Sequence, residues 1–217
     1  MASERPQINA SSTYPSDIAF TPTVKAIQSD KGSRQAYSRM EAAGSWQTLI
    51  TPELKAFIEN QTSAFLATAN AAGQPYIQHR GGPAGFLRVL DERTIGFVDY
   101  VGNRQYITLG NLKENPKAHL FLIDYARRRR FKVWGELSAA EGDQALTARL
   151  MPVGYEAKAE RVMLFAVFAW DANCPRHIPT RVDAADVTAA LAERDQRIKA
   201  LEAQIEQLRS TARQGLP

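Results

Sequence analysis

The feature that most constrains the fold is a series of short segments, rich in branched and aromatic residues, that begins after Asn60. The segment Ala64–Thr68 is separated from Pro75–Ile77 by the turn Asn70–Gly73, which predicts a strand hairpin. Connections between the segments suit antiparallel neighbours and are too short for repeated parallel crossovers. We therefore expect a six-stranded antiparallel β-barrel, since closure removes exposed edges. The further strand candidates are Gly85–Leu90, Thr94–Tyr100, Ala118–Asp124, Arg130–Ser138 and Met163–Trp170.

Helix signals surround these strands. Helix formers dominate from Val24 to Met40, with a break at Lys31–Ser33. Thr51, Pro52 and Glu53 supply an N-cap, a first-turn proline and an early acid for another helix. The segments Asn103–Asn115 and Gly142–Leu150 also have the pattern of short helices.

The chain is expected to have three regions. Residues 1–50 form an N-terminal extension with helices, and its first 22 or so residues are polar and contain Pro6, Pro15 and Pro22. Residues 51–180 form the barrel, and residues 181–217 a C-terminal helix.

Apolar residues of the last region alternate by four and three positions, which is typical of a coiled coil or of an amphipathic helix. Isoleucines occupy the a positions and leucines two of the d positions, as in a short parallel pair. Arg197 and Glu202 would then face each other across the two chains. Packing of the helix on its own barrel is the alternative, and either reading indicates interaction rather than catalysis. The residues concerned are Val187, Leu191, Arg194, Ile198, Leu201, Ile205 and Leu208.

Composition excludes several classes of function. Three histidines and one cysteine, Cys174, cannot make a zinc site from repeated cysteine pairs or an intrachain disulfide, so we expect no metal and a reducing, cytoplasmic setting. No run approaches the roughly 18 apolar residues that a membrane span needs, and the N-terminus lacks a signal-peptide pattern. The net charge of +4 fits a small anionic ligand as well as it fits nucleic acid.

Several stretches resemble, in their order and spacing, the flavin-binding core of the pyridoxamine 5'-phosphate oxidase family. They are Gly73–Tyr76 leading into Gly85–Glu92, then Ile95–Gln105, Asn111–Ala118 and Phe131–Leu137. The resemblance covers roughly Phe57 to Trp170. It implies a six-stranded split barrel that forms a homodimer, with two molecules of flavin mononucleotide (FMN) in clefts between the subunits. From the residues themselves we expect neither nucleic acid nor membrane as a partner.

In that family the FMN phosphate is held by a basic pair on the second and third strands and by a small-polar, basic, polar triplet at the next helix. The matching strand residues are Arg88 and, if Gly81–Pro83 is a local insertion, Arg80. The triplet matches at Asn103, Arg104 and Gln105.

The residue types agree with such a site. A helix that starts after Gly102 offers unpaired backbone N–H groups to an anion, and arginines add charge-assisted hydrogen bonds. Glycines at positions 81 and 82 would let the main chain approach a flat ring, because no Cβ intervenes. Tyr100 could cover a ring face or contact the ribityl chain.

The run Arg127–Arg130 is the most conspicuous charge cluster. As a nucleic-acid patch it lacks interleaved aromatic residues. The resemblance implies instead that Arg130 points at the flavin of the second subunit, where a cation would stabilise negative charge that develops on reduction.

The segment from Ala169 to Ile178 collects polar groups where a strand ends, and we interpret it as a cleft wall. Its substrate-facing candidates are Trp170, Asn173, Cys174 and His177. The alternative is that Trp170 fills the core and Cys174 is a small buried residue. No third residue that would orient a Cys–His nucleophilic pair is identifiable.

The resemblance implies an FMN-dependent oxidoreductase acting on a small substrate, for which a reduced nicotinamide is one possible electron donor. The chain lacks the closing Arg-Leu-His-x-Arg type of motif with which true pyridoxamine phosphate oxidases recognise the substrate phosphate, so a vitamin B6 substrate does not follow. The alternative function is a non-catalytic flavin carrier or sensor whose C-terminal helix recruits a partner.

Overall fold

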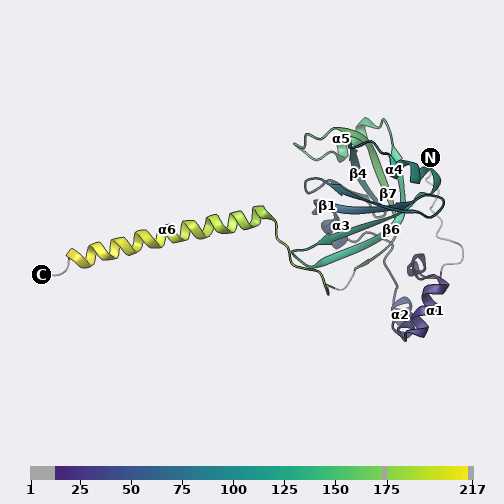
Figure 1. Cartoon of the computed structure of the whole chain (residues 1–217), viewed down its shortest axis with the longest axis horizontal. Coiled ribbons are helices and arrows are strands. Elements are labelled where there is room, and N and C mark those ends of the chain that lie inside the picture. Colours follow the sequence, from purple (N-terminus) through teal and green to yellow (C-terminus); the bar gives the residue numbers. More distant parts are fainter. Residues whose placement is uncertain (1–12, 173–174, 215–217) are drawn as a thin grey trace. The chain divides into compact units, whose positions relative to one another are not determined.

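A computed structural model describes residues 13–172 and 175–214 (Figure 1). The helices are η1, a 3₁₀ helix (Pro15–Ile18), and α1 (Pro22–Asp30), α2 (Arg34–Ala42), α3 (Pro52–Glu59), α4 (Ile107–Glu114), α5 (Gln144–Leu150) and α6 (Ala184–Gln214). The strands are β1 (Ser63–Ala69), β2 (Pro75–Gly81), β3 (Leu87–Asp91), β4 (Thr94–Tyr100), β5 (Lys117–Asp124), β6 (Arg129–Ala140) and β7 (Ala159–Ala172).

The chain divides into two compact units. The first contains the described residues up to Asp124 together with Arg129–Arg176, and therefore all of the strands named above. The second contains Tyr125–Arg128 and the residues from His177 onward, including α6. In the part of the chain that the structure describes, no helix is both long and apolar enough to cross a membrane.

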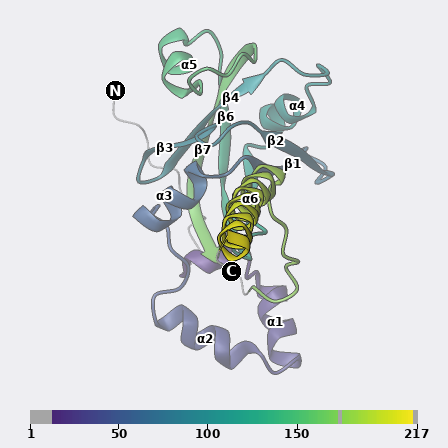
Figure 2. The same ribbon diagram turned by 90° about the vertical axis from the view of Figure 1, so that its left-hand side faces the viewer.

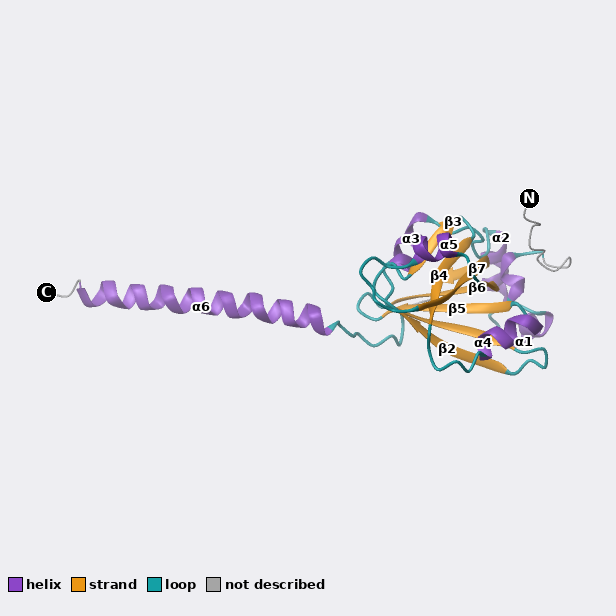
Figure 3. Cartoon of the chain, turned by 90° about the horizontal axis from the view of Figure 1, so that it is seen from above, coloured by secondary structure: helices purple, strands orange, loops and turns teal. Residues whose placement is uncertain are grey.

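The strands form an antiparallel sheet in the order β2-β1-β5-β6-β7-β4-β3 (Figures 2 and 3). Over residues 13–172 and 175–214 the sheet has seven strands rather than the six expected. The hairpin arm predicted at Pro75–Ile77 is longer than its apolar residues suggested. It continues to Gly81 and pairs with β1 over its whole length, so it is a strand in its own right.

The sheet curls until its two ends approach each other, but the barrel is closed there by side chains. Among the described strand pairs, no backbone ladder joins β2 to β4 or to β3. Instead Arg80 at the end of β2 forms an ion pair with Asp99 on β4, the sixth strand in sheet order. This arrangement is a split barrel, as the resemblance implied.

Strict alternation of side chains builds the core. Leu66, Leu120, Val133 and Phe165 point into the barrel and are almost completely buried. Helix α3 lies beside β3 and adds its apolar face to the same core (Figure 2). Its expected cap is confirmed, since Leu54 N donates to the Thr51 hydroxyl at 3.2 Å.

The N-terminal extension packs on the outside of the barrel. Trp46 stacks on Trp134 of β6 with ring centroids 4.5 Å apart, and the indole N–H of Trp170 donates to the Leu49 carbonyl at 2.8 Å. The helix break predicted at Lys31–Ser33 is confirmed, and Pro6 lies outside the described residues.

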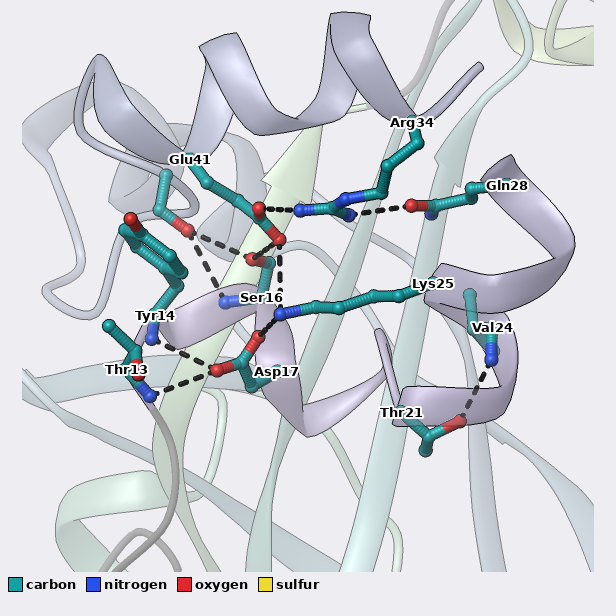
Figure 4. A network of polar contacts seen from close by, with 11 residues as sticks. Thr13, Tyr14, Ser16, Asp17, Thr21, Val24, Lys25, Gln28, Arg34 and Glu41 are labelled. Carbon is teal, nitrogen blue, oxygen red and sulfur yellow. Dashed lines mark hydrogen bonds and ion pairs between the residues drawn. The ribbon is translucent and has the colours of Figure 1, made fainter. Parts of the chain in front are cut away.

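A buried carboxylate ties the extension together. Glu41, 3% exposed, accepts hydrogen bonds from Arg34 and, at 3.4 Å, from the Ser16 hydroxyl (Figure 4). Lys25 lies between Glu41 and Asp17, with its Nζ 2.6 Å from Asp17 Oδ1. These contacts link η1, α1 and α2, which are too short to be stable helices without tertiary contacts.

One glycine is required by close backbone approach. Gly135 lies at a register shift between β6 and β7, where an added Cβ would be 1.9 Å from the Ala166 carbonyl oxygen. Gly135→Ala should therefore destabilise the barrel by about 3 kcal/mol or more in urea unfolding. Gly110→Ala is the control, because Gly110 lies in α4 with open space around it, and alanine there should be neutral or gain up to about 1 kcal/mol. Equal stability of the two variants would contradict this assignment.

His119 on β5 makes the stability of the fold depend on pH. Burial, assisted by the nearby charge of Lys132, lowers the pKa of His119 from 6.5 to about 4. Between these two pKa values His119 binds a proton in the unfolded chain but not in the folded chain. The free energy of unfolding therefore falls as pH drops from about 6.5 towards about 4. Allowing for partial exposure, the loss attributable to His119 is on the order of 2 kcal/mol. Subtracting the pH-stability curve of His119→Gln from that of the unchanged chain measures it, and a flat difference would refute the assignment.

Candidate functional site

A cleft opens where the barrel is split. It lies between the inner face of β2, the end of β4, the turn that follows β4, the start of α4 and the start of β7. The lining residues are Tyr76, Gln78, Arg80, Asp99, Tyr100, Gly102, Asn103, Arg104, Gln105, Tyr106, Ile107, Thr108, Leu109, Glu160 and Arg161.

The inner face of β2 supplies one wall. Tyr76, Gln78 and Arg80 lie opposite Thr68, Leu66 and Ala64 of β1, so all three point to the inside of the barrel. Most of the inner face is apolar, but β2 borders the split and carries polar side chains. The Tyr76 hydroxyl donates to Gln78 Oε1 at 2.9 Å, which fixes both.

Asp99 joins the two sides of the split. It is 8% exposed and accepts hydrogen bonds from Arg80 and, at 3.0 Å, from Arg161 Nη1. Burial by itself lowers the pKa of Arg161, but the hydrogen bond to Asp99 and the charge of Glu160 outweigh burial, so its pKa is raised. Arg161 is therefore charged, and each carboxylate oxygen of Asp99 accepts from a different arginine.

Buried polar atoms in the cleft still have capacity to bind. The Nε of Arg80 and the hydroxyl of Tyr100 are buried, and neither has a hydrogen-bond partner within the described residues. Burial, with a smaller contribution from Tyr155, raises the pKa of Tyr100, so its hydroxyl remains a donor. Unpaired buried donors are uncommon in folded proteins, and here they indicate a site where a ligand could supply the hydrogen-bond acceptor.

The turn after β4 brings backbone N–H groups to the same place. Arg104 and Tyr106 have φ angles of 57° and 54°, in the left-handed region that side chains other than glycine rarely adopt. The sequence predicted a helix that starts at Asn103, but these two residues do not have helical backbone angles, so α4 begins at Ile107. Tyr106 provides no side-chain cap, so the first N–H groups of α4 are left for another acceptor.

Contacts from β7 hold this turn in position. The Tyr106 hydroxyl donates to Glu160 Oε1 at 2.9 Å, and the Arg161 guanidinium lies 5.5 Å from the centre of the Tyr106 ring. Arg161 therefore supports both the turn and Asp99.

The structure brings together five of the residues predicted to bind the cofactor. They are Arg80, Tyr100, Asn103, Arg104 and Gln105, all in the lining of the cleft. Gly81 is the last residue of β2 and Gly82 and Pro83 follow it, so Arg80 lies on the strand itself.

Four other predicted residues lie outside this lining. A Cβ on Gly81 would be 2.8 Å from the His79 ring, and one on Gly82 would be 2.7 Å from Phe86 Cβ, so contacts within the chain already account for both glycines. Arg88 lies on β3 opposite Gly96, with a buried Nε that has no partner among the described residues. Arg130 is half-buried on β6 opposite Ile123.

The residues predicted to face a substrate are close in sequence, but Trp170 belongs to the first compact unit and His177 to the second. Trp170 is on β7, where its indole N–H is already used by Leu49 and its ring packs edge-on against Phe131. Asn173 and Cys174 lie outside the described residues. His177 is exposed and belongs to the second unit.

Sequence reasoning missed several residues of the cleft. Tyr76 and Gln78 could have been found, because they alternate with Arg80 along one strand face. Asp99 could also have been found, since an acid near the end of the apolar strand Thr94–Tyr100 needs a partner of opposite charge. Nothing in the sequence links Arg161 to Asp99, 62 residues away.

Comparison with known proteins places the chain in a family. The family model of pyridoxamine 5'-phosphate oxidase matches residues 50–174, more than half of the sequence. The chain belongs to this family. No curated protein sequence matches it.

Several solved structures with similar folds match this chain over most of their own length. HupZ of Group A Streptococcus is 22% identical with a TM-score of 0.44, and the match covers 61% of this chain and 99% of that one. An FMN-binding protein from Syntrophomonas wolfei is 15% identical with a TM-score of 0.47, covering 69% and 97%. The heme storage protein HutZ from Vibrio cholerae is 18% identical with a TM-score of 0.36, covering 54% and 88%.

The stability of the split barrel should depend on Asp99. Asp99→Asn would leave Arg80 buried without the counter-charge of Asp99, whereas Arg161 would keep its ion pairs with Glu141 and Glu160, and we expect a loss of about 3 kcal/mol in urea unfolding. Glu53→Gln is the control, because its ion pair with Arg129 is exposed and should contribute less than about 1 kcal/mol. A loss no larger than that of the control would mean that the split is held by other contacts.

Proposed function

We propose that the cleft binds the phosphate of FMN. Membership of the pyridoxamine 5'-phosphate oxidase family supports the cofactor, and the buried, unpaired Nε of Arg80 is the single observation that best supports its position. The lining contains three arginines and two carboxylates, which leaves one positive charge to attract a dianion. Arg80, Arg104 and the first N–H groups of α4 would hold the phosphate oxygens, and Tyr100 would contact the rest of the cofactor.

The size of the cleft favours a homodimer. Its volume of about 50 Å³ is enough for a phosphate group, whereas sites for whole cofactors usually occupy roughly 300–1,000 Å³. The flavin ring would therefore need walls from a second subunit. The outer face of β1, β2 and β5 is suited to such an interface, because it carries Phe65, Phe121 and the 65% exposed Ile77.

We further propose that the protein is an FMN-dependent oxidoreductase for a small substrate. When bound, FMN supplies the ability to accept and donate a hydride or electrons. The chain's own part is to fix the phosphate and to place charge near the ring, for which Arg130 of the second subunit remains our candidate. Trp170 would form a wall but could not donate a hydrogen bond to a substrate, because Leu49 already accepts from its N–H.

A non-catalytic flavin carrier or sensor is the second candidate. The exposed apolar residues of α6 favour it, since such a helix suits recruitment of a partner. The absorbance spectrum of the purified protein, before and after addition of NADH or NADPH and an acceptor, separates the candidates. Steady turnover supports the oxidoreductase, and bound flavin without turnover supports the carrier. Protein that is colourless and takes up no added FMN would contradict both.

Arg104 provides the sharpest test of the phosphate site. Its side chain is exposed, so Arg104→Ala should fold normally and yet weaken FMN binding by about 1.5–3 kcal/mol, the usual loss for a hydrogen bond to a charged group. Flavin fluorescence titration measures the effect. Arg149→Ala is the matched control, because Arg149 is an exposed arginine of α5 outside the cleft lining.

Arg88→Ala decides whether the phosphate contacts extend to β3. A loss comparable with that of Arg104→Ala would include Arg88 in the site. FMN affinity unchanged in both Arg88→Ala and Arg104→Ala would overturn the proposed position of the phosphate.

A further inference from the structure

Helix α6 has a stripe of apolar residues, interrupted at Arg194, that lies open to solvent. The helix spans 31 residues, from Ala184 to Gln214 (Figure 1). Six large apolar side chains recur along it at intervals of four and three, or seven where Arg194 replaces one of them. Each is between 42% and 65% exposed: Val187, Leu191, Ile198, Leu201, Ile205 and Leu208.

A heptad assignment follows from these intervals. Leu191, Ile198 and Ile205 occupy a positions, whereas Val187, Leu201 and Leu208 occupy d positions. Isoleucine at a with leucine at d is the combination that favours two parallel strands. We propose that α6 pairs with α6 of a second copy of this chain as a parallel, in-register coiled coil. This interface does not depend on the cofactor site.

The charges beside the stripe are complementary in that arrangement. Arg197 is at a g position, and Glu202 is at the following e position, which the g residue of the second copy faces. The two residues are five apart, so they are not neighbours on their own helix, where pairs lie three or four apart. Arg197 and Glu202 can therefore form an ion pair between two chains but not within one helix.

An antiparallel pair is less favourable. To keep the apolar layers aligned, Ile198 would have to face Leu201 of the second copy. Glu202 would then lie beside Asp195 of that copy, and two carboxylates would repel each other. Charge thus selects the parallel orientation.

Arg194 is the polar residue of the stripe, at a d position. In a parallel pair the two Arg194 side chains would share one layer and repel each other. Asp195 occupies the adjoining e position of each helix, within reach of the arginine of the other copy. This layer lowers stability but fixes the register, since a shift by one heptad would place Arg194 against an apolar residue.

Disulfide trapping in the full chain tests the proposal. In a Cys174→Ser background, Leu201→Cys would place two thiols in the same d layer, within the span of a disulfide, and should give about tenfold more covalent dimer than Ala203→Cys. Ala203 is the matched control, because it lies two residues away on the opposite face of the helix. Equal cross-linking of both variants, or none in either, would overturn the proposal. So would a disulfide that forms only when Leu201→Cys is mixed with Ile198→Cys, which would indicate an antiparallel pair.

Charge reversal, added to the Leu201→Cys chain, gives a second measurement. Arg197→Glu and Glu202→Arg each place like charges across the proposed interface, whereas a mixture of the two variants pairs opposite charges on both sides. The mixture should give more covalent dimer than either variant alone. Equal yields in all three samples would contradict the assigned g and e positions.

Discussion

The Asp99 carboxylate is the contact on which the architecture of the site depends. Backbone ladders join the neighbouring strands of the sheet, but β2 is joined to β4 by the ion pair of Arg80 with Asp99, which Arg161 supports from β7. A carboxylate in this position repays its burial only if both oxygens are paired, and Arg80 and Arg161 pair them. The result is a barrel with a permanent polar seam, and it is this seam that leaves room for an anion.

If FMN binds at this seam as proposed, one chain supplies only part of its site. Arg80 donates from one terminal nitrogen to Asp99 and from the other, at 3.4 Å, to Thr108, so its buried Nε is left without a partner among the described residues. The turn at Arg104 and Tyr106 brings the uncapped start of α4 to the same cleft. These groups suit a phosphate, whereas a flavin ring needs a much larger surface. Cofactor binding and dimerisation are therefore linked in this account, because each subunit would complete the other's site.

Much of the fold could be predicted from the sequence. Local signals predicted the strands from their alternating side chains, the helix break at Gly32 and the helix cap at Thr51. The structure has all three features. Each of the seven strands coincides with a segment predicted from the sequence, although a barrel of six was expected. The second strand was predicted too short because the polar residues from Gln78 to Arg80 hide the second half of β2, whose inner face borders the seam and not the core. The start of α4 was misplaced because strain at Arg104 and Tyr106 follows from packing against β7, which no local pattern reveals.

The candidate site was accessible only in part. Residues that follow one another, such as Asn103 to Gln105, could be found by order and spacing, whereas Asp99 and Arg161 form a pair only after β4 and β7 have met. The two glycines have a second explanation that the sequence does not reveal, since Gly81 and Gly82 make room for His79 and Phe86 of their own chain. Close approach can serve internal packing as well as a ligand.

The most direct test of the account compares FMN with riboflavin, which has the same ring but no phosphate. If the seam binds the phosphate, FMN should bind at least about a hundredfold more tightly, because two or more charge-assisted hydrogen bonds are lost with riboflavin. Arg104→Ala should narrow that ratio by weakening FMN alone. Equal affinity for the two flavins in the unchanged protein would contradict a phosphate site at the split of the barrel.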